Sequence, residues 1–230
     1  MAIAIMLSLI VSVPAATDAE NEVRATALAK IELCQERLGN QNGVVVEDGV
    51  LCLSGGLDEA RAEQYRDVTQ GRTFTHAVLR SNGGYVSDAL DIAEDLLARQ
   101  ITAIGWEYCL SSCANYLFMA GDRKILMAGH LLAWHGGPGG PDSISPDNEY
   151  RDDLIAEWER SNAFYDAIGV DPALMGAVPE GHPFDYDNPG MSFFVAPREH
   201  LEAFGVRGIL VYDDMDTWER TESRVSIPIH

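Results

Sequence analysis

Three short segments of this chain carry residue types that together could perform acyl transfer. They are residues 81–84 (Ser-Asn-Gly-Gly), 109–116 (Cys-Leu-Ser-Ser-Cys-Ala-Asn-Tyr) and 134–137 (Trp-His-Gly-Gly). Acyl transfer needs a hydroxyl or thiol that a nearby imidazole activates, and preorganised N–H donors that face the developing oxyanion. We therefore interpret the segments, in chain order, as an oxyanion-binding turn, a nucleophile and a base.

The glycine pair lies between a predicted strand and a predicted helix. Residues 75–80 form a short, partly apolar run that is typical of a strand, and the glycines end it. Apolar residues then recur at helical spacing from Val86 to Leu97. At such a turn backbone N–H groups point outward, and glycine lets the chain approach a ligand closely. Gly83 and Gly84 are thus a candidate oxyanion site.

The nucleophile segment repeats this arrangement. Residues 101–105 predict a strand and residues 114–120 a buried helix, so Ser111 and Ser112 fall at the start of that helix. A serine there lies at the positive end of the helix dipole, and the N–H group after it can join the same anion site. Either serine meets this description.

The candidate base ends a third apolar stretch. Residues 125–135 are broken at Gly129, which predicts two short strands with His135 at the end of the second. A histidine at a strand end is well placed to face a pocket. The Gly/Pro-rich loop over 136–146 follows it directly and could shape or cover a substrate groove.

On these segments the chain resembles the Clp protease proteolytic subunit and secreted or periplasmic ClpP-like proteins of the ClpP/crotonase superfamily. Residues 81–86 resemble that family's Ser-Pro-Gly-Gly turn, with Asn82 in place of proline, and residues 112–121 resemble its nucleophile helix. Residues 49–55 and 196–206 resemble the first core strand and the late helix. The resemblance implies a single α/β domain, a superhelix of repeated β-β-α units.

The resemblance also implies roles for individual residues. The register that preserves the downstream helix makes Ser112 the nucleophile, His135 the base, and the N–H groups of Gly84 and Cys113 the oxyanion donors. Secreted relatives often show a Cys-x-Ser-x-Cys pattern, which favours Ser111 instead. The nucleophile is therefore open by one residue, and we expect Ser112.

The third member of a catalytic triad is less well defined. In the proteases an acid shortly precedes the late helix, but residues 191–193 (Met-Ser-Phe) contain none. Asp185 and Asp187 lie a few residues earlier, and we take Asp187 as the candidate acid, although both are also typical turn residues. Without an acid, a Ser-His pair lacks the group that fixes the imidazole tautomer. The alternative function is therefore a catalytically inactive secreted binding or scaffold protein.

Composition indicates one exported domain. The 230 residues, 47% of them hydrophobic, suffice for one α/β core. Residues 1–16 are apolar and end in small residues, which predicts a secretory signal peptide that is too short for a comfortable membrane span. No Lys or Arg precedes the run, so an uncleaved anchor is the alternative. We expect an N-terminal segment over 17–42, the ClpP-like domain over 43–230, and a periplasmic or secreted protein.

Charge and cysteine content limit the partners. A formal net charge of −20 argues against nucleic acid binding. Four cysteines in an exported chain predict two disulfides, Cys34 with Cys52 and Cys109 with Cys113. An unpaired Cys113 at a helix start would have a lowered pKa and could itself be nucleophilic. The cysteines lack the spacing of a zinc site.

We therefore predict an exported serine hydrolase, a peptidase acting on a peptide or other acyl substrate. No metal or organic cofactor is expected, and no stable membrane insertion after signal cleavage. Ring-forming relatives suggest a homo-oligomer. An acyl-CoA enzyme of the crotonase branch fits poorly, because export separates the protein from CoA.

Overall fold

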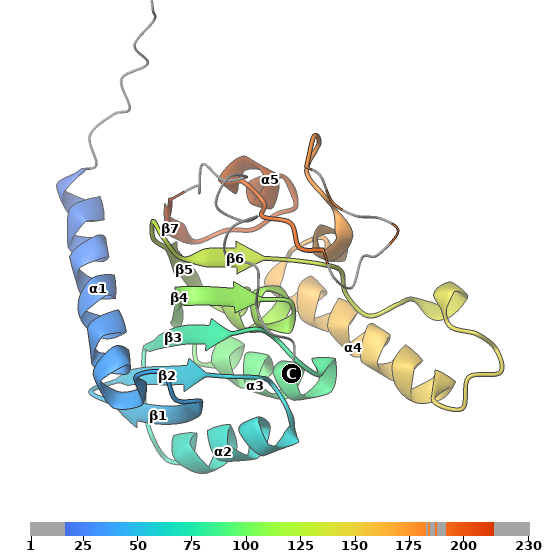
Figure 1. Ribbon diagram of the computed structural model, residues 1–230, viewed down its shortest axis with the longest axis horizontal. Helices are drawn as coiled ribbons and strands as arrows, with labels where there is room; N and C mark the ends of the chain where they lie inside the picture. The colour runs from blue at the N-terminus through green and yellow to red at the C-terminus, as the bar shows by residue number, and fades with distance from the viewer. Residues whose placement is uncertain (1–16, 183, 185–186, 188–191, 214–230) are drawn as a thin grey trace, which may run out of the picture.

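The computed structural model describes residues 17–182, 184, 187 and 192–213, and the predicted signal peptide and Asp185 lie outside these residues. The described part is an α/β fold built around one mostly parallel sheet (Figure 1). This confirms the predicted α/β class.

Seven strands of the described chain form the sheet. They pair in the order β1-β2-β3-β4-β5-β7, and the short β6 pairs with the last residues of β4 beyond the end of β5. Only β1 runs antiparallel, in a hairpin with β2. The strands are β1 (Gly43–Glu47), β2 (Val50–Ser54), β3 (His76–Ser81), β4 (Thr102–Leu110), β5 (Arg123–Leu126), β6 (Leu131–Ala133) and β7 (Ile209–Tyr212).

Helices cover both faces of this sheet. On one face α2 and α3 pack with a buried π-helix over the larger apolar core, and on the other face α1 packs over a smaller one. The helices are α1 (Asp18–Leu38), α2 (Glu59–Thr69), α3 (Val86–Ala98), the π-helix (Cys113–Phe118), α4 (Arg151–Ile168) and α5 (Arg198–Ala203). Burial on both faces explains why the central strands are apolar throughout instead of alternating.

The N-terminal helix is attached at both of its ends. Thr17 caps its first turn by accepting a hydrogen bond from the N–H of Glu20. Near its start Arg24 forms an ion pair with Asp213 after β7, and near its end Cys34 is disulfide-bonded to Cys52 of β2. The predicted segment over 17–42 is therefore a helix docked on the sheet.

Helix α4 packs against α3 through polar contacts. Arg160 donates to Asp91 and Glu94 on α3, and Glu157 accepts from the N–H of Ser87 in the first turn of α3. Because α3 begins directly after the glycine turn, α4 helps to hold the residues at that end. In Figure 1 the rest of α4 extends away from the sheet.

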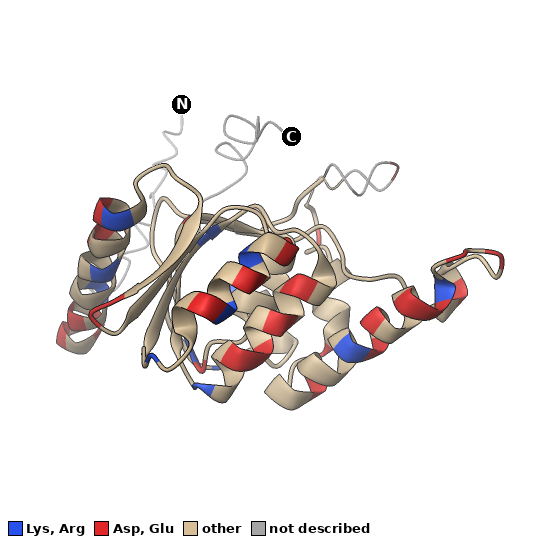
Figure 2. Ribbon diagram, turned by 90° about the horizontal axis from the view of Figure 1, so that it is seen from below, with Lys and Arg blue, Asp and Glu red and all other residues tan. Residues whose placement is uncertain are grey.

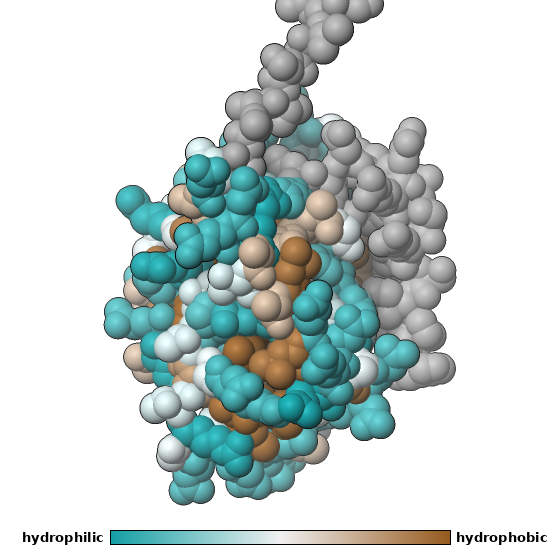
Figure 3. Space-filling model, turned by 90° about the vertical axis from the view of Figure 1, so that its left-hand side faces the viewer, coloured by the Kyte–Doolittle hydropathy of each residue, from teal (hydrophilic) through white to brown (hydrophobic). Residues whose placement is uncertain are grey.

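Acidic side chains lie on the outer faces of the helices. Figure 2 shows Asp and Glu spread along the helices rather than gathered in one place, with Lys and Arg between them. The view onto the α1 side in Figure 3 shows a largely hydrophilic surface that surrounds an apolar patch. Large exposed apolar side chains include Leu28 of α1 and Leu210 of β7. No helix within the described ranges has the length and hydropathy that a membrane span requires.

The predicted elements are found with two differences. Strand β4 continues five residues past the predicted end at residue 105, up to the nucleophile segment. The helix predicted over 114–120 is a π-helix over Cys113–Phe118. Both predicted disulfides are confirmed, Cys34 with Cys52 and Cys109 with Cys113.

Candidate functional site

The three predicted segments meet at one edge of the sheet. Strands β3, β4 and β6 are adjacent and parallel, so their carboxyl ends lie side by side. The glycine turn follows β3, Ser111 follows β4, and His135 lies two residues beyond β6. In parallel α/β sheets this edge is where ligands generally bind.

Ser111 occupies a strained turn between β4 and the π-helix. Its φ is +53°, a left-handed conformation that is uncommon for a residue other than glycine. Its N–H donates to the carbonyl of Ala133 at 3.0 Å, which continues the β4–β6 pairing up to the turn. The serine is only partly buried, and its Oγ lies 2.5 Å from Nε2 of His135. A hydroxyl and an imidazole are thus in direct hydrogen-bond contact.

His135 is held by backbone contacts on both sides. Trp134 exchanges two backbone hydrogen bonds with Phe194, and the carbonyl of Gly136 accepts from the Asn115 side chain at 2.8 Å. Burial lowers the pKa of His135 below its usual value of 6.5. The imidazole is therefore neutral near pH 7, the form that can take a proton from a hydroxyl.

In the structure His135 contacts Ser111, one residue before the expected nucleophile Ser112. Ser112 is 3% exposed, and its hydroxyl donates to the carbonyl of Gly84 at 2.8 Å. The two neighbouring hydroxyls point to different partners because Ser111 lies in the left-handed turn, whereas Ser112 is the N-cap of the π-helix.

The glycine turn contacts the nucleophile turn directly. A Cβ atom on Gly83 would lie 2.7 Å from Cβ of Ser111, so only glycine fits there. Gly84 forms a parallel bridge with Leu57 in which the N–H of Leu57 and that of Tyr85 are the donors. Within the residues described, the N–H of Gly84 has no acceptor, as an oxyanion donor requires.

The identity of the second oxyanion donor depends on which serine is the nucleophile. A donor belongs to the residue after the nucleophile, so a nucleophilic Ser111 makes the N–H of Ser112 the donor in place of that of Cys113. Ser112 is the N-cap of the π-helix, at the end where N–H groups have no partner inside the helix, and its nitrogen lies next to Gly83. Cys113 itself is fully buried and bonded to Cys109, so it is not a free thiol.

The described contacts do not test the predicted acid. Asp187 is exposed, and the described contacts of His135 are the Ser111 hydroxyl and the ring of Phe193. Over the ranges that the structure describes, no carboxylate contacts the imidazole. The role of Asp187 stays a prediction.

Two residues that hold the base were missed from the sequence. Asn115 lies on the π-helix, where its apolar surroundings suggest only packing, yet its amide ties the helix to the segment after His135. Phe193 lies far from His135 along the chain, and its ring stands 4.9 Å from the imidazole between centroids. No local pattern marks either residue.

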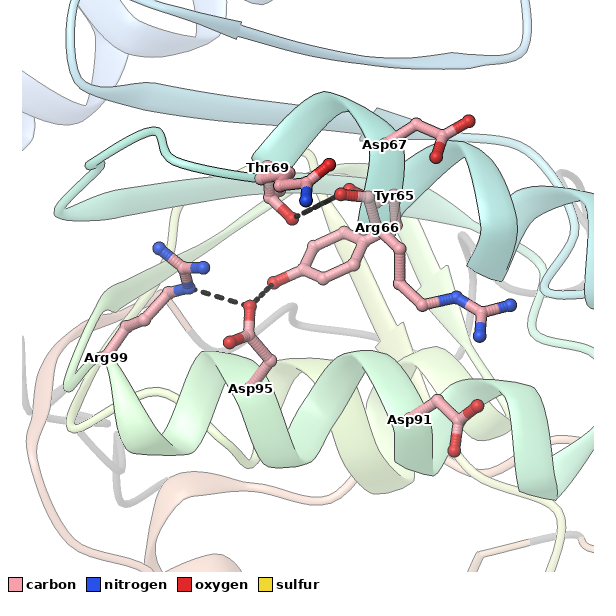
Figure 4. A pocket seen from close by; sticks show the side chains of 8 residues that line it. Tyr65, Arg66, Asp67, Thr69, Asp91, Asp95 and Arg99 are labelled. Atoms are coloured by element: carbon pink, nitrogen blue, oxygen red, sulfur yellow. Dashed lines mark hydrogen bonds and ion pairs between the residues drawn. The ribbon is translucent and has the colours of Figure 1, made fainter.

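A pocket of about 410 Å³ at the far end of α3 is separate from this site (Figure 4). There Asp95 of α3 accepts from the Tyr65 hydroxyl of α2 at 2.6 Å and from Arg99 at 2.7 Å. Burial and the contact with Asp95 raise the pKa of Tyr65 far above its usual value. This network joins α2 to α3 and so supports the helix that begins at the glycine turn.

Comparisons with known proteins give a likeness of structure only. No protein-family model matches the chain, and no curated protein matches it. Among solved structures, a mutant of ClpP1 from Listeria monocytogenes is similar with a TM-score of 0.44 and 12% identity. The similar region covers 73% of this chain and 93% of that one.

Proposed function

We propose that this protein is a serine hydrolase in which Ser111 is the nucleophile and His135 the general base. The observation that carries the proposal is the 2.5 Å contact between Ser111 Oγ and His135 Nε2 at the carboxyl edge of the parallel sheet. Two further features support it, namely the left-handed turn that carries the partly buried Ser111 and the N–H of Gly84, for which the described part of the chain offers no acceptor.

The proposed reaction has two steps, acylation of Ser111 and hydrolysis of the acyl-enzyme, and the same groups act in both. Ser111 Oγ attacks the acyl carbonyl while His135 Nε2 takes its proton, and the N–H groups of Gly84 and Ser112 bind the oxyanion. His135 then returns the proton to the leaving group as the carbon–leaving-group bond breaks. Water attacks the acyl-enzyme by the same route, which releases the acid and restores the serine.

We expect the enzyme to be slow. Nε2 can accept the serine proton only in the tautomer that carries its proton on Nδ1, and a carboxylate usually selects that tautomer. Loss of this acid in a serine protease lowers kcat by about 10⁴. The oxyanion donors and the neutral imidazole would still support acylation by a reactive electrophile.

The finer parts of the proposal concern substrate and context. We propose a peptide or other acyl substrate, membership of the ClpP/crotonase superfamily, export to an oxidising compartment and assembly into a homo-oligomer. The two disulfides are compatible with export, since such bonds persist in oxidising compartments. Native mass measurement and localisation of the mature chain would test assembly and export.

The proposal is tested by labelling the oxidised protein with a fluorophosphonate and measuring the intact mass. We expect one adduct that is lost in Ser111→Ala and strongly slowed in His135→Ala. Ser112→Ala is the matched control, because it removes the neighbouring hydroxyl from a buried position. Labelling should persist there, since Ser112 is proposed to contribute its backbone N–H.

The competing function is a catalytically inactive binding or scaffold protein. It is favoured by one observation, that in the described part of the chain His135 meets a phenyl ring and no carboxylate. No adduct on the wild-type protein would support this function and refute the hydrolase. An adduct that survives Ser111→Ala and disappears in Ser112→Ala would refute Ser111 as the nucleophile.

A further inference from the structure

The segment after the candidate acid is paired with the strand that carries the base. Trp134 and Phe194 form an antiparallel bridge in which each N–H donates to the other's carbonyl, at 2.9 and 2.7 Å. One step along this register places His135 directly opposite Phe193. The next pair after a hydrogen-bonded one is a non-hydrogen-bonded pair, whose side chains lie closer together. The two rings therefore meet as cross-strand neighbours.

The contact between these rings has a defined geometry. Their centroids are 4.9 Å apart and their planes make an angle of 63°, a T-shaped arrangement of the kind that aromatic pairs prefer. A ring in this position restricts rotation of the imidazole about its Cβ–Cγ bond. It also keeps water from one side of the imidazole while Nε2 remains directed at Ser111.

The other described groups that the structure places next to the His135 segment are uncharged. From β4 and the π-helix come the hydroxyl of Ser111 and the amide of Asn115, which binds the following residue. From the 182–194 segment the titratable groups described are His182, which packs on the ring of Phe194, and Asp187, which is exposed. Among the described groups, the ring of Phe193 contacts the imidazole, with the ring centroids 4.9 Å apart.

We propose that Phe193 is the positioning residue of His135, its ring holding the imidazole with Nε2 toward Ser111. The catalytic consequence rests on the proposed hydrolase function. The effect on the imidazole itself does not, so the two can fail separately.

The experiment compares Phe193→Ala and Phe193→Tyr with the wild type in two measurements. NMR titration of the His135 imidazole reports its pKa whether or not the protein is an enzyme. The rate of fluorophosphonate labelling above pH 8, where the imidazole is neutral in every variant, reports its alignment with Ser111. Phe204→Ala is the matched control, because Phe204 is also partly buried and its ring lies 5.0 Å from that of His200, outside the site.

In Phe193→Ala we expect the pKa of His135 to rise toward 6.5 as water reaches the ring. The labelling rate should fall roughly two- to tenfold, the factor that an aromatic contact is worth. Phe193→Tyr keeps the ring and should restore both values, and Phe204→Ala should change neither. Phe193→Leu, which keeps apolar bulk without an aromatic ring, serves if the alanine variant does not fold; it should slow labelling as the alanine variant does, while the pKa of His135 stays low.

The inference is overturned if both the alanine and leucine variants titrate and label as the wild type does. It is equally overturned if Phe204→Ala produces the same changes, because the effect would then be general. If the wild type is not labelled at all, the hydrolase proposal fails, and the titration alone still decides the role of Phe193.

Discussion

The contact between the glycine turn and the nucleophile turn gives the sharpest test of the site, through Gly83→Ala. Gly83 has φ of +90°, and a Cβ atom there would lie 2.7 Å from Cβ of Ser111, 2.8 Å from the carbonyl oxygen of Leu110 and 2.9 Å from the nitrogen of Ser112. Two of these neighbours are backbone atoms, which cannot move away by changing a rotamer. The alanine must therefore displace the turn that carries the nucleophile.

The expected size of the effect follows from these contacts. A left-handed conformation costs an L-residue about 1–2 kcal/mol, and overpacking a well-packed site costs about 1–3 kcal/mol more. We therefore expect a loss of roughly 2–5 kcal/mol in the free energy of unfolding. Since a misplacement of about 1 Å can cost 10²-fold in rate, labelling of Ser111 should slow by about ten- to a hundredfold.

Gly129→Ala is the control that introduces the backbone strain of a left-handed alanine without the steric clash found at Gly83. Gly129 has φ of +86°, but nothing lies within 4 Å of a Cβ atom placed on it. This variant should lose only about 1–2 kcal/mol in urea unfolding and should label at the wild-type rate. The reasoning is refuted if Gly83→Ala labels within twofold of the wild type and is no less stable than Gly129→Ala.

Three further predictions concern the same chain. Replacing Cys109 and Cys113 by alanine should cost about 2 kcal/mol in urea unfolding and slow fluorophosphonate labelling, because their disulfide closes the loop that holds the nucleophile turn; wild-type labelling kinetics would show that the turn holds without it. Asp213→Asn should lower the free energy of unfolding at pH 7 by about 1 kcal/mol, the upper range for a partly exposed ion pair. The hydrogen bond from Arg24 holds the pKa of Asp213 below its usual range, so this stabilisation should be present above pH 4 and disappear in acid; a difference that persists after protonation contradicts the ion pair as its source. Burial lowers the pKa of His135, so the labelling rate should decrease in acid with a midpoint below pH 6.5. A midpoint above pH 7 would indicate that a carboxylate contacts the imidazole.

Much of the candidate site could be predicted because its parts are local. The glycine turn, the two serines at a helix start and the histidine at a strand end are each defined by a few consecutive residues and the periodicity of their neighbours. The pairing of Cys109 with Cys113 is also local, since the four-residue separation brings them together at a strand-to-helix turn. These predictions depend on short-range sterics and hydrogen bonding, which the sequence specifies directly.

The choice between Ser111 and Ser112 could not be made from such patterns. It depends on the π-helix and on the left-handed turn before it, which place one hydroxyl against His135 and the other against the carbonyl of Gly84. The helical pattern of apolar residues is the same whichever of the two serines is the nucleophile. The Cys-x-Ser-x-Cys pattern favours Ser111, whereas the register that preserves the family's downstream spacing to Tyr116 and Gly121 favours Ser112.

The sequence by itself determined which chemical groups the site contains and that each stands at the end of a predicted strand. Only the tertiary structure decided which serine meets the histidine, which N–H groups lie beside that serine, and that the ring of Phe193 contacts the imidazole. The physical reason is that a contact between distant segments depends on strand order and register. A shift of one residue turns a side chain to the opposite face, and local patterns leave such a shift undetermined.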